Sequence, residues 1–164
     1  MHNAALYLRT IVFGINDSLV STVGFLAGLS VAGVPKHTII LTGIIYALVE
    51  AFSMAMGDFL SEESAEEYES RAEVNQRPSV IAGILMFTSC VLASFIPLVP
   101  YMAFSGFLAL TLSILFSISV LFIVGVISAR LARLPMLWRG FRMASFGGAA
   151  IILGVGVGLL MPVA

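Results

Sequence analysis

Five long apolar stretches strongly restrict the folds that this chain can adopt. Each approaches or exceeds the roughly 18 apolar residues that mark a membrane-spanning helix. They cover residues 11–31, 38–60, 79–96, 103–128 and 143–161. Hydrophobic residues make up 60% of the chain and charged residues 10%, whereas soluble domains have about 45–50% and about 25%. We therefore expect residues 1–164 to form a single all-α integral membrane domain, with five transmembrane helices in a lipid bilayer.

The basic residues gather on one side of the five predicted spans. An odd number of spans places the two termini on opposite sides, and only Lys36 then falls on the C-terminal side. Cytoplasmic loops carry the excess of Lys and Arg in membrane proteins. We therefore expect the N-terminus inside and the C-terminus outside. The basic residues on the inner side are Arg9, Arg71, Arg77, Arg130, Arg133, Arg139 and Arg142.

Prolines and arginines mark two of the predicted connections. Pro97 and Pro100 are expected to form a short turn between the third and fourth spans, because proline interrupts helical hydrogen bonding. The arginines from Arg130 to Arg142 are expected to form a basic loop before the fifth span.

Several classes of function lack the residues that they require. The chain has a single cysteine, Cys90, so it has no internal disulfide framework, and we interpret Cys90 as a small packing residue. His2 and His37 lie at the ends of spans and no nucleophile–base pair is visible, which argues against an enzyme. There is no Cys/His cluster for structural zinc and no basic patch for nucleic acid. We expect no permanently bound cofactor.

Acidic side chains within the predicted spans are the strongest functional signal. Glu50, Met54 and Asp58 recur at i, i+4 and i+8, so they share one face of a helix. Asp17 lies about six residues, or roughly 9 Å, into the first span, at a depth similar to that of Met54. A charged group deep in the bilayer costs at least about 2.5–3.5 kcal/mol, so it usually faces a bundle interior or a wet cavity. We interpret these four residues as metal ligands along a cation path; the alternative is a protonated carboxyl bonded to a neighbouring helix.

Small residues share the face of Asp17 on the first span. Such residues let helices approach closely, and Gly24 with Gly28 forms a GxxxG pair. We expect this face to be a helix-packing seam that also carries an aspartate. The predicted packing residues are Gly14, Ser21, Gly24 and Gly28.

An acidic segment follows the second span and is predicted to be a cytoplasmic helix over residues 61–77. Four of its carboxylates recur at i, i+4, i+7 and i+11. They are Glu62, Glu66, Glu69 and Glu73. A solvated acidic face is the ordinary explanation of such a run. Divalent cations would relieve the repulsion between its charges, and carboxylate oxygens suit them, so we expect this helix to attract metal ions.

Two motifs resemble signatures of the vacuolar iron transporter family. Residues 14–24, GINDSLVSTVG, resemble GxNDGLVSTxG, and residues 53–61, SMAMGDFLS, resemble SMAxGEYxS. The resemblance implies a five-span homodimer that exports Fe²⁺ or Mn²⁺ from the cytosol in exchange for protons. It also implies an ion path between the two copies of the first two spans. The family's aspartate and methionine in that path match Asp17 and Met54.

The chain departs from the family pattern at four places. Ser18 replaces a glycine, Asp58 replaces a glutamate, and residues 62–78 stand where the family has long cytoplasmic metal-binding helices. Glu50 replaces a small residue near the predicted midplane. Burial disfavours a charged carboxyl and an arriving cation favours it. Glu50 is therefore our candidate for proton coupling.

These observations predict a transporter that moves Fe²⁺ and/or Mn²⁺ out of the cytosol, by proton antiport through a homodimer interface. The alternative is a membrane-anchored metal-binding or accessory protein that moves no ions. The expected location is the plasma (inner) membrane in a prokaryote, and the vacuolar membrane or another endomembrane in a eukaryote.

Overall fold

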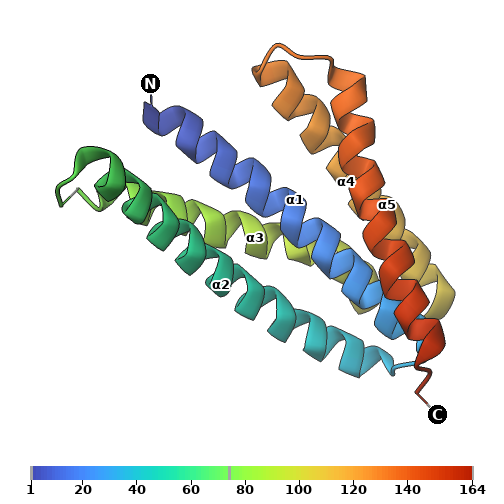
Figure 1. The fold of residues 1–164 in the computed structure, drawn as a ribbon. Helices are drawn as coiled ribbons and strands as arrows, with labels where there is room; N and C mark the ends of the chain where they lie inside the picture. Colours follow the sequence, from blue (N-terminus) through green and yellow to red (C-terminus); the bar gives the residue numbers. More distant parts are fainter. Residues whose placement is uncertain (1, 74, 164) are drawn as a thin grey trace.

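Five long α-helices make up nearly all of the structure (Figure 1). The computed structural model describes residues 2–73 and 75–163. The helices are α1 (His2–Val31), α2 (Lys36–Ser70), α3 (Arg77–Ala103), α4 (Gly106–Leu131) and α5 (Met136–Leu160). Each of them is long and apolar enough to cross a membrane. The prediction of an all-helical chain with five candidate spans is confirmed.

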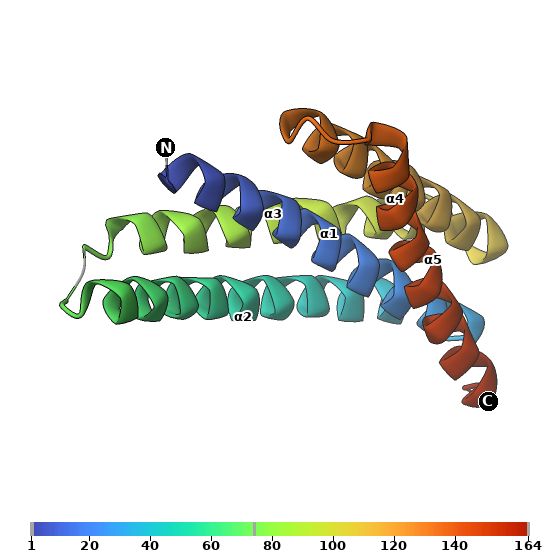
Figure 2. The same cartoon turned by 45° about the horizontal axis from the view of Figure 1, so that its top comes forward.

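Helix α1 is the central element of the bundle. It contacts each of the other four helices, while α2 packs along α3 and α4 packs along α5. Figure 2 shows α2 and α3 running side by side, with α4 and α5 on the other side of α1. The N- and C-termini lie at opposite ends of the bundle (Figure 1). Side chains on different faces of α1 can therefore reach two separate helix pairs.

The small residues of α1 lie against two different neighbours. A Cβ atom on Gly24 would lie 2.8 Å from the Ala150 carbonyl oxygen, and one on Gly28 would lie 2.7 Å from the Gly154 carbonyl oxygen, both on α5. The backbones of α1 and α5 are therefore in direct contact, which is what small residues at this spacing allow. Gly14, ten residues before Gly24, lies instead against side chains of α3.

The turn expected at Pro97 and Pro100 is wrong, because α3 continues through both prolines to Ala103. Proline is tolerated inside such helices where neighbouring groups help to satisfy the backbone. At this point the Ser113 hydroxyl of α4 donates a hydrogen bond of 2.7 Å to the Pro97 carbonyl, which joins α3 to α4. The chain turns later, at Gly106, whose φ of +62° favours glycine.

The basic loop is also shorter than expected. Helix α4 extends to Leu131 and α5 begins at Met136, directly after Pro135, so Arg139 and Arg142 lie on α5. The length of an apolar stretch reflects the thickness of the membrane core. The helix itself can continue beyond the membrane core, because its backbone hydrogen bonds do not require apolar side chains. The expected span boundary at residue 143 therefore underestimates the length of the helix.

Helix α2 is continuous from Lys36 into the acidic segment, but it ends at Ser70 rather than at residue 77. Arg71 has a left-handed φ of 55° and its N–H bonds to the Glu67 carbonyl. The Ser70 hydroxyl also bonds to the backbone of Ala72, an arrangement that competes with helical bonding. Glu73 consequently lies outside the helix, and the predicted four-carboxylate helical face loses this member.

Candidate functional site

Three pairs of polar side chains connect α1 with α2, and we call them the α1–α2 polar seam. Ser21 donates to Glu50 Oε1 at 2.5 Å, Thr10 donates to Asp58 Oδ2 at 3.1 Å, and Arg9 donates to Glu62 Oε2 at 3.0 Å. The acidic members are spaced by eight and four residues, so they occupy one face of α2. The seam thus consists of the residues Arg9, Thr10, Ser21, Glu50, Asp58 and Glu62.

Only one of the two carboxylate oxygens of Glu50 accepts hydrogen bonds in the described part of the chain. Its Oε1 accepts from Ser21 and also from the Tyr46 hydroxyl at 3.0 Å. Tyr46 lies one turn earlier on α2, and its ring stacks on that of Phe25 at a centroid distance of 4.6 Å. The other oxygen, Oε2, is buried and has no hydrogen-bond partner among the residues that the structure describes. A buried carboxylate oxygen without a partner is rare, and it can accept either a proton or a cation.

Asp17 lies on α1 one turn before Ser21 and is partly exposed. Its charge is within electrostatic reach of Glu50. Both salt bridges among the described residues belong to Arg9, so the Asp17 carboxylate is not neutralised by a basic side chain there. The two carboxylates therefore create a negative region inside the bundle that favours a cation.

Met54 contacts α3 through its sulfur. The distance between Met54 Sδ and Cys90 Sγ is 3.8 Å. Around these atoms Met54 packs with the buried residues Ala51, Ala55 and Met86. Met54 thus lies on the side of α2 that faces α3, whereas Glu50 and Asp58 bond to α1.

No three His, Cys, Asp or Glu side chains come close enough to hold one metal ion among residues 2–73 and 75–163. The predicted ligands therefore do not form a complete carboxylate site within the described part of one chain. Asp58 and Glu62 are engaged with Arg9 at 3.9 Å and 3.0 Å. Glu66 is partly exposed on α2, while Glu69 is exposed near the helix end.

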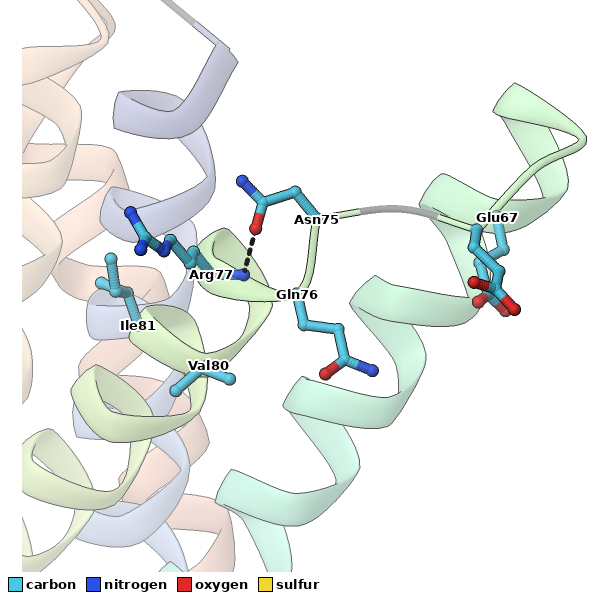
Figure 3. Close-up of a pocket in the computed structure, with 7 residues that line it drawn as sticks. Glu67, Asn75, Gln76, Arg77, Val80 and Ile81 are labelled. Atoms are coloured by element: carbon cyan, nitrogen blue, oxygen red, sulfur yellow. Dashed lines mark hydrogen bonds between the residues drawn. The ribbon is translucent and has the colours of Figure 1, made fainter.

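The junction of α2 and α3 forms an open pocket of about 780 Å³ at the acidic end of the bundle. Figure 3 shows Arg77 directed away from Glu67, on the side of α3 nearer α1. Asn75 Oδ1 accepts a hydrogen bond of 3.2 Å from the Arg77 backbone N–H, which fixes the start of α3. Gln76 bonds to Glu63 across the junction. The pocket is lined by Glu67, Glu73, Asn75, Gln76, Arg77, Val80 and Ile81.

Sequence reasoning missed four residues that contact the predicted ligands. Tyr46 precedes Glu50 by one helical turn, so the i, i+4 spacing could have identified it. The partners Arg9, Thr10 and Cys90 could not be found in this way. They lie at least 36 residues from Asp58, Glu62 or Met54 in the sequence.

Comparison with known proteins identifies the family of the chain. A sequence model of the VIT family matches the chain over residues 8–80 and 70–159. Vacuolar iron transporter 1 of Tulipa gesneriana is 31% identical over 74 residues, which is 45% of this chain and 30% of that relative. The matched part therefore spans less than a third of the curated relative. With five helices able to cross a membrane, the chain is an integral multi-pass membrane protein. Because the family match extends from α1 to the end of α5, the chain belongs to the VIT family.

Proposed function

We propose that this protein transports divalent transition-metal ions, Fe²⁺ and/or Mn²⁺, across its membrane and out of the cytosol. The observation that carries the proposal is the pair of carboxylates inside the bundle. Within the described part of the chain, Asp17 has no basic partner and Glu50 has a buried oxygen without a hydrogen bond. Membership of the VIT family and the name of the tulip relative support the same function. A purely structural carboxyl would be expected to use both of its oxygens.

The direction of transport follows from the orientation that the charges favour. The α1 start, the α2 end and the α4–α5 connection lie at one end of the bundle (Figure 1). The arginines belong to these segments or, for Arg77, to the start of α3, whereas Lys36 begins α2 at the opposite end. By the positive-inside rule, the arginine-bearing end is cytoplasmic. The acidic end of α2 then extends into the cytosol, where it collects metal ions for export.

A homodimer would complete the metal site. Within the described residues of one chain, no group of three acidic, histidine or cysteine side chains surrounds a common point. Fe²⁺ and Mn²⁺ require more ligands than one or two. A second copy of α1 and α2 would supply a second Asp17 and a second Met54, in keeping with the ion path that the family resemblance implies.

Proton exchange at Glu50 would drive the export. The buried oxygen of Glu50 binds a proton when no metal is near, and an incoming divalent cation displaces it, because an opposite charge favours the carboxylate. Ser21 and Tyr46 hold the other oxygen in place during this exchange. Each metal ion that leaves is thereby coupled to a proton that enters.

The experiment is metal flux into proteoliposomes that hold the purified protein and a pH-sensitive dye. We expect Fe²⁺ and Mn²⁺ to move in exchange for protons, and Zn²⁺ serves as the comparison ion. Metal binding without flux above that of empty liposomes would contradict transport. It would favour the second candidate, a membrane-anchored metal-binding or accessory protein, which the acidic end of α2 also fits.

A further inference from the structure

Four arginines gather where α4 passes into α5, and we call them the α4–α5 arginines. Two lie at the end of α4 or just after it, and two lie in the first two turns of α5; they are Arg130, Arg133, Arg139 and Arg142. Three of them are exposed, and Arg139 is partly buried. A Cβ on Gly125 of α4 would lie 2.8 Å from the Arg139 carbonyl oxygen. The two helix backbones therefore touch here, which keeps the four charges together.

The α4–α5 arginines have no carboxylate partner within the described part of the chain. Both salt bridges there belong to Arg9, and the sequence has no acidic residue after Glu73. The glutamates that follow the second span belong to α2 and its end, and Figure 2 shows α2 and α3 on the opposite side of α1 from α4 and α5. The counter-charge for these arginines must therefore come from outside this chain.

Large apolar side chains are exposed between the arginines. Trp138 is 70% exposed, and Leu137 and Phe141 are exposed beside it. Trp138 and Arg142 are four residues apart, so they share one face of α5. Tryptophan and long basic side chains are both typical of the headgroup level of a bilayer, where one end of the side chain is apolar and the other is wet. A soluble anion would account for the arginines alone, whereas a lipid accounts for both kinds of side chain.

The turn itself does not call for an arginine at position 133. The Leu134 N–H bonds to the Ala129 carbonyl at 2.9 Å, and the Arg133 N–H bonds to the Arg130 carbonyl at 3.2 Å. This pattern ends a helix with one residue in the left-handed conformation, and that residue is usually glycine. Arg133 has a φ of 54°, a conformation that glycine adopts more easily. The role of Arg133 is therefore in its side chain and not in its backbone.

We propose that the α4–α5 arginines bind the headgroup of an anionic phospholipid, while Trp138 and its apolar neighbours lie against the upper part of the acyl chains. Guanidinium groups bind phosphate oxygens through two parallel hydrogen bonds. Four or more basic residues next to a membrane span are typical of anionic lipid recognition. The site is separate from the carboxylates proposed to carry ions, which lie between α1 and α2.

The fluorescence of Trp138 tests this site directly, because Trp138 is the single tryptophan of the chain. The full chain is reconstituted in phosphatidylcholine vesicles that contain an equal fraction of either brominated phosphatidylglycerol or brominated phosphatidylcholine. Bromine atoms on acyl chains quench a tryptophan that they contact. We expect the anionic lipid to be preferred at Trp138 by at least about fivefold, the effect of one arginine near an anionic surface. Replacing all four arginines with glutamine should make the two lipids quench equally.

Arg133→Gly separates lipid binding from folding. Glycine suits the left-handed position better, so the unfolding temperature in a neutral detergent should be unchanged or higher. The preference for the anionic lipid should nevertheless fall toward that of the fourfold variant. Arg77→Gln is the matched control, because it removes one positive charge at the start of α3, and it should keep the preference of the wild type.

Equal quenching of the wild type by the two lipids would overturn the proposal. A preference that persists in the folded fourfold variant, or in Arg133→Gly at its full size, would overturn it as well. If equal quenching were accompanied by a smaller assembly of the fourfold variant in detergent, the occupant would instead be the acidic end of α2 from another copy of the chain.

Discussion

Ser21 of α1 donates a hydrogen bond to Glu50 of α2, 29 residues further along the chain. Ser21 belongs to the stripe of small residues on α1, and Glu50 stands where the family pattern has a small residue. The contact therefore joins a helix-packing position to the carboxyl proposed to carry protons. It leaves the second Glu50 oxygen buried and, among the described residues, without a hydrogen-bond partner.

Glu50→Gln should separate proton coupling from metal binding. Glutamine keeps the size of the side chain and can still accept from Ser21 and Tyr46, but it cannot exchange a proton. We expect metal flux to stop or to become insensitive to a pH gradient, while metal still binds. Flux through the variant that responds to the pH gradient as the wild type does would eliminate Glu50 as the proton carrier.

Asp17→Asn should abolish transport while leaving expression and dimerisation intact. The substitution keeps the shape of the side chain and removes the negative charge that attracts the cation. We expect the rate of metal flux to fall by at least about 10- to 100-fold, the usual scale for damage to a metal site. The measurement is proteoliposome flux at equal protein content, and flux at the wild-type rate would show that Asp17 is not a ligand.

Met54→Leu should change ion selectivity more than stability. Leucine has a similar volume, so the packing against Ala51 and Ala55 is retained, typically at a cost below about 1.5 kcal/mol. Loss of the thioether should reduce the flux of softer ions most. Competition between Zn²⁺, Fe²⁺ and Mn²⁺ measures this, with Met56→Leu as the control. An equal loss for all three ions would indicate a packing defect instead.

Replacing Glu62, Glu66, Glu69 and Glu73 with glutamine should raise the apparent KM for metal, with a smaller effect on the maximal rate. These residues lie at the acidic end of α2 or just beyond it, where they would gather ions before entry. Added salt should act in the same direction, because exposed charges are screened over about 10 Å at 0.1 M ionic strength. A collapse of the maximal rate at constant KM would contradict an ion-collecting role.

Gly154→Ala should destabilise the protein, while Gly156→Ala on the same helix should not. A Cβ on Gly154 would fall on the Gly24 carbonyl of α1, whereas one on Gly156 would meet nothing within 4 Å. Overpacking against a backbone typically costs about 1–3 kcal/mol, and alanine at an open helical position gains about 0.5–1 kcal/mol over glycine. Thermal unfolding in detergent measures both variants, and equal unfolding temperatures would contradict a tight α1–α5 contact.

The spacing of charged residues along α2 allowed part of the candidate site to be anticipated. Glu50 and Asp58 both face α1, as their separation of eight residues predicts. The direction of Met54 was not predictable in the same way, because its sulfur contacts α3. The position of a residue on a helix shows which way its side chain points, but not which helix it meets. The neighbouring helix at that position depends on the angle at which the helices cross.

The sequence alone determined the number and class of the helices, because apolar length is a local property that the bilayer thickness sets. It also determined that Gly24 and Gly28 could pack closely, but not that α5 would be their partner. Only the tertiary structure decided that α3 continues through Pro97, that Arg9 pairs with Glu62, and that Cys90 meets Met54. Each of these outcomes depends on a contact between distant segments, and such contacts arise only when the helices pack.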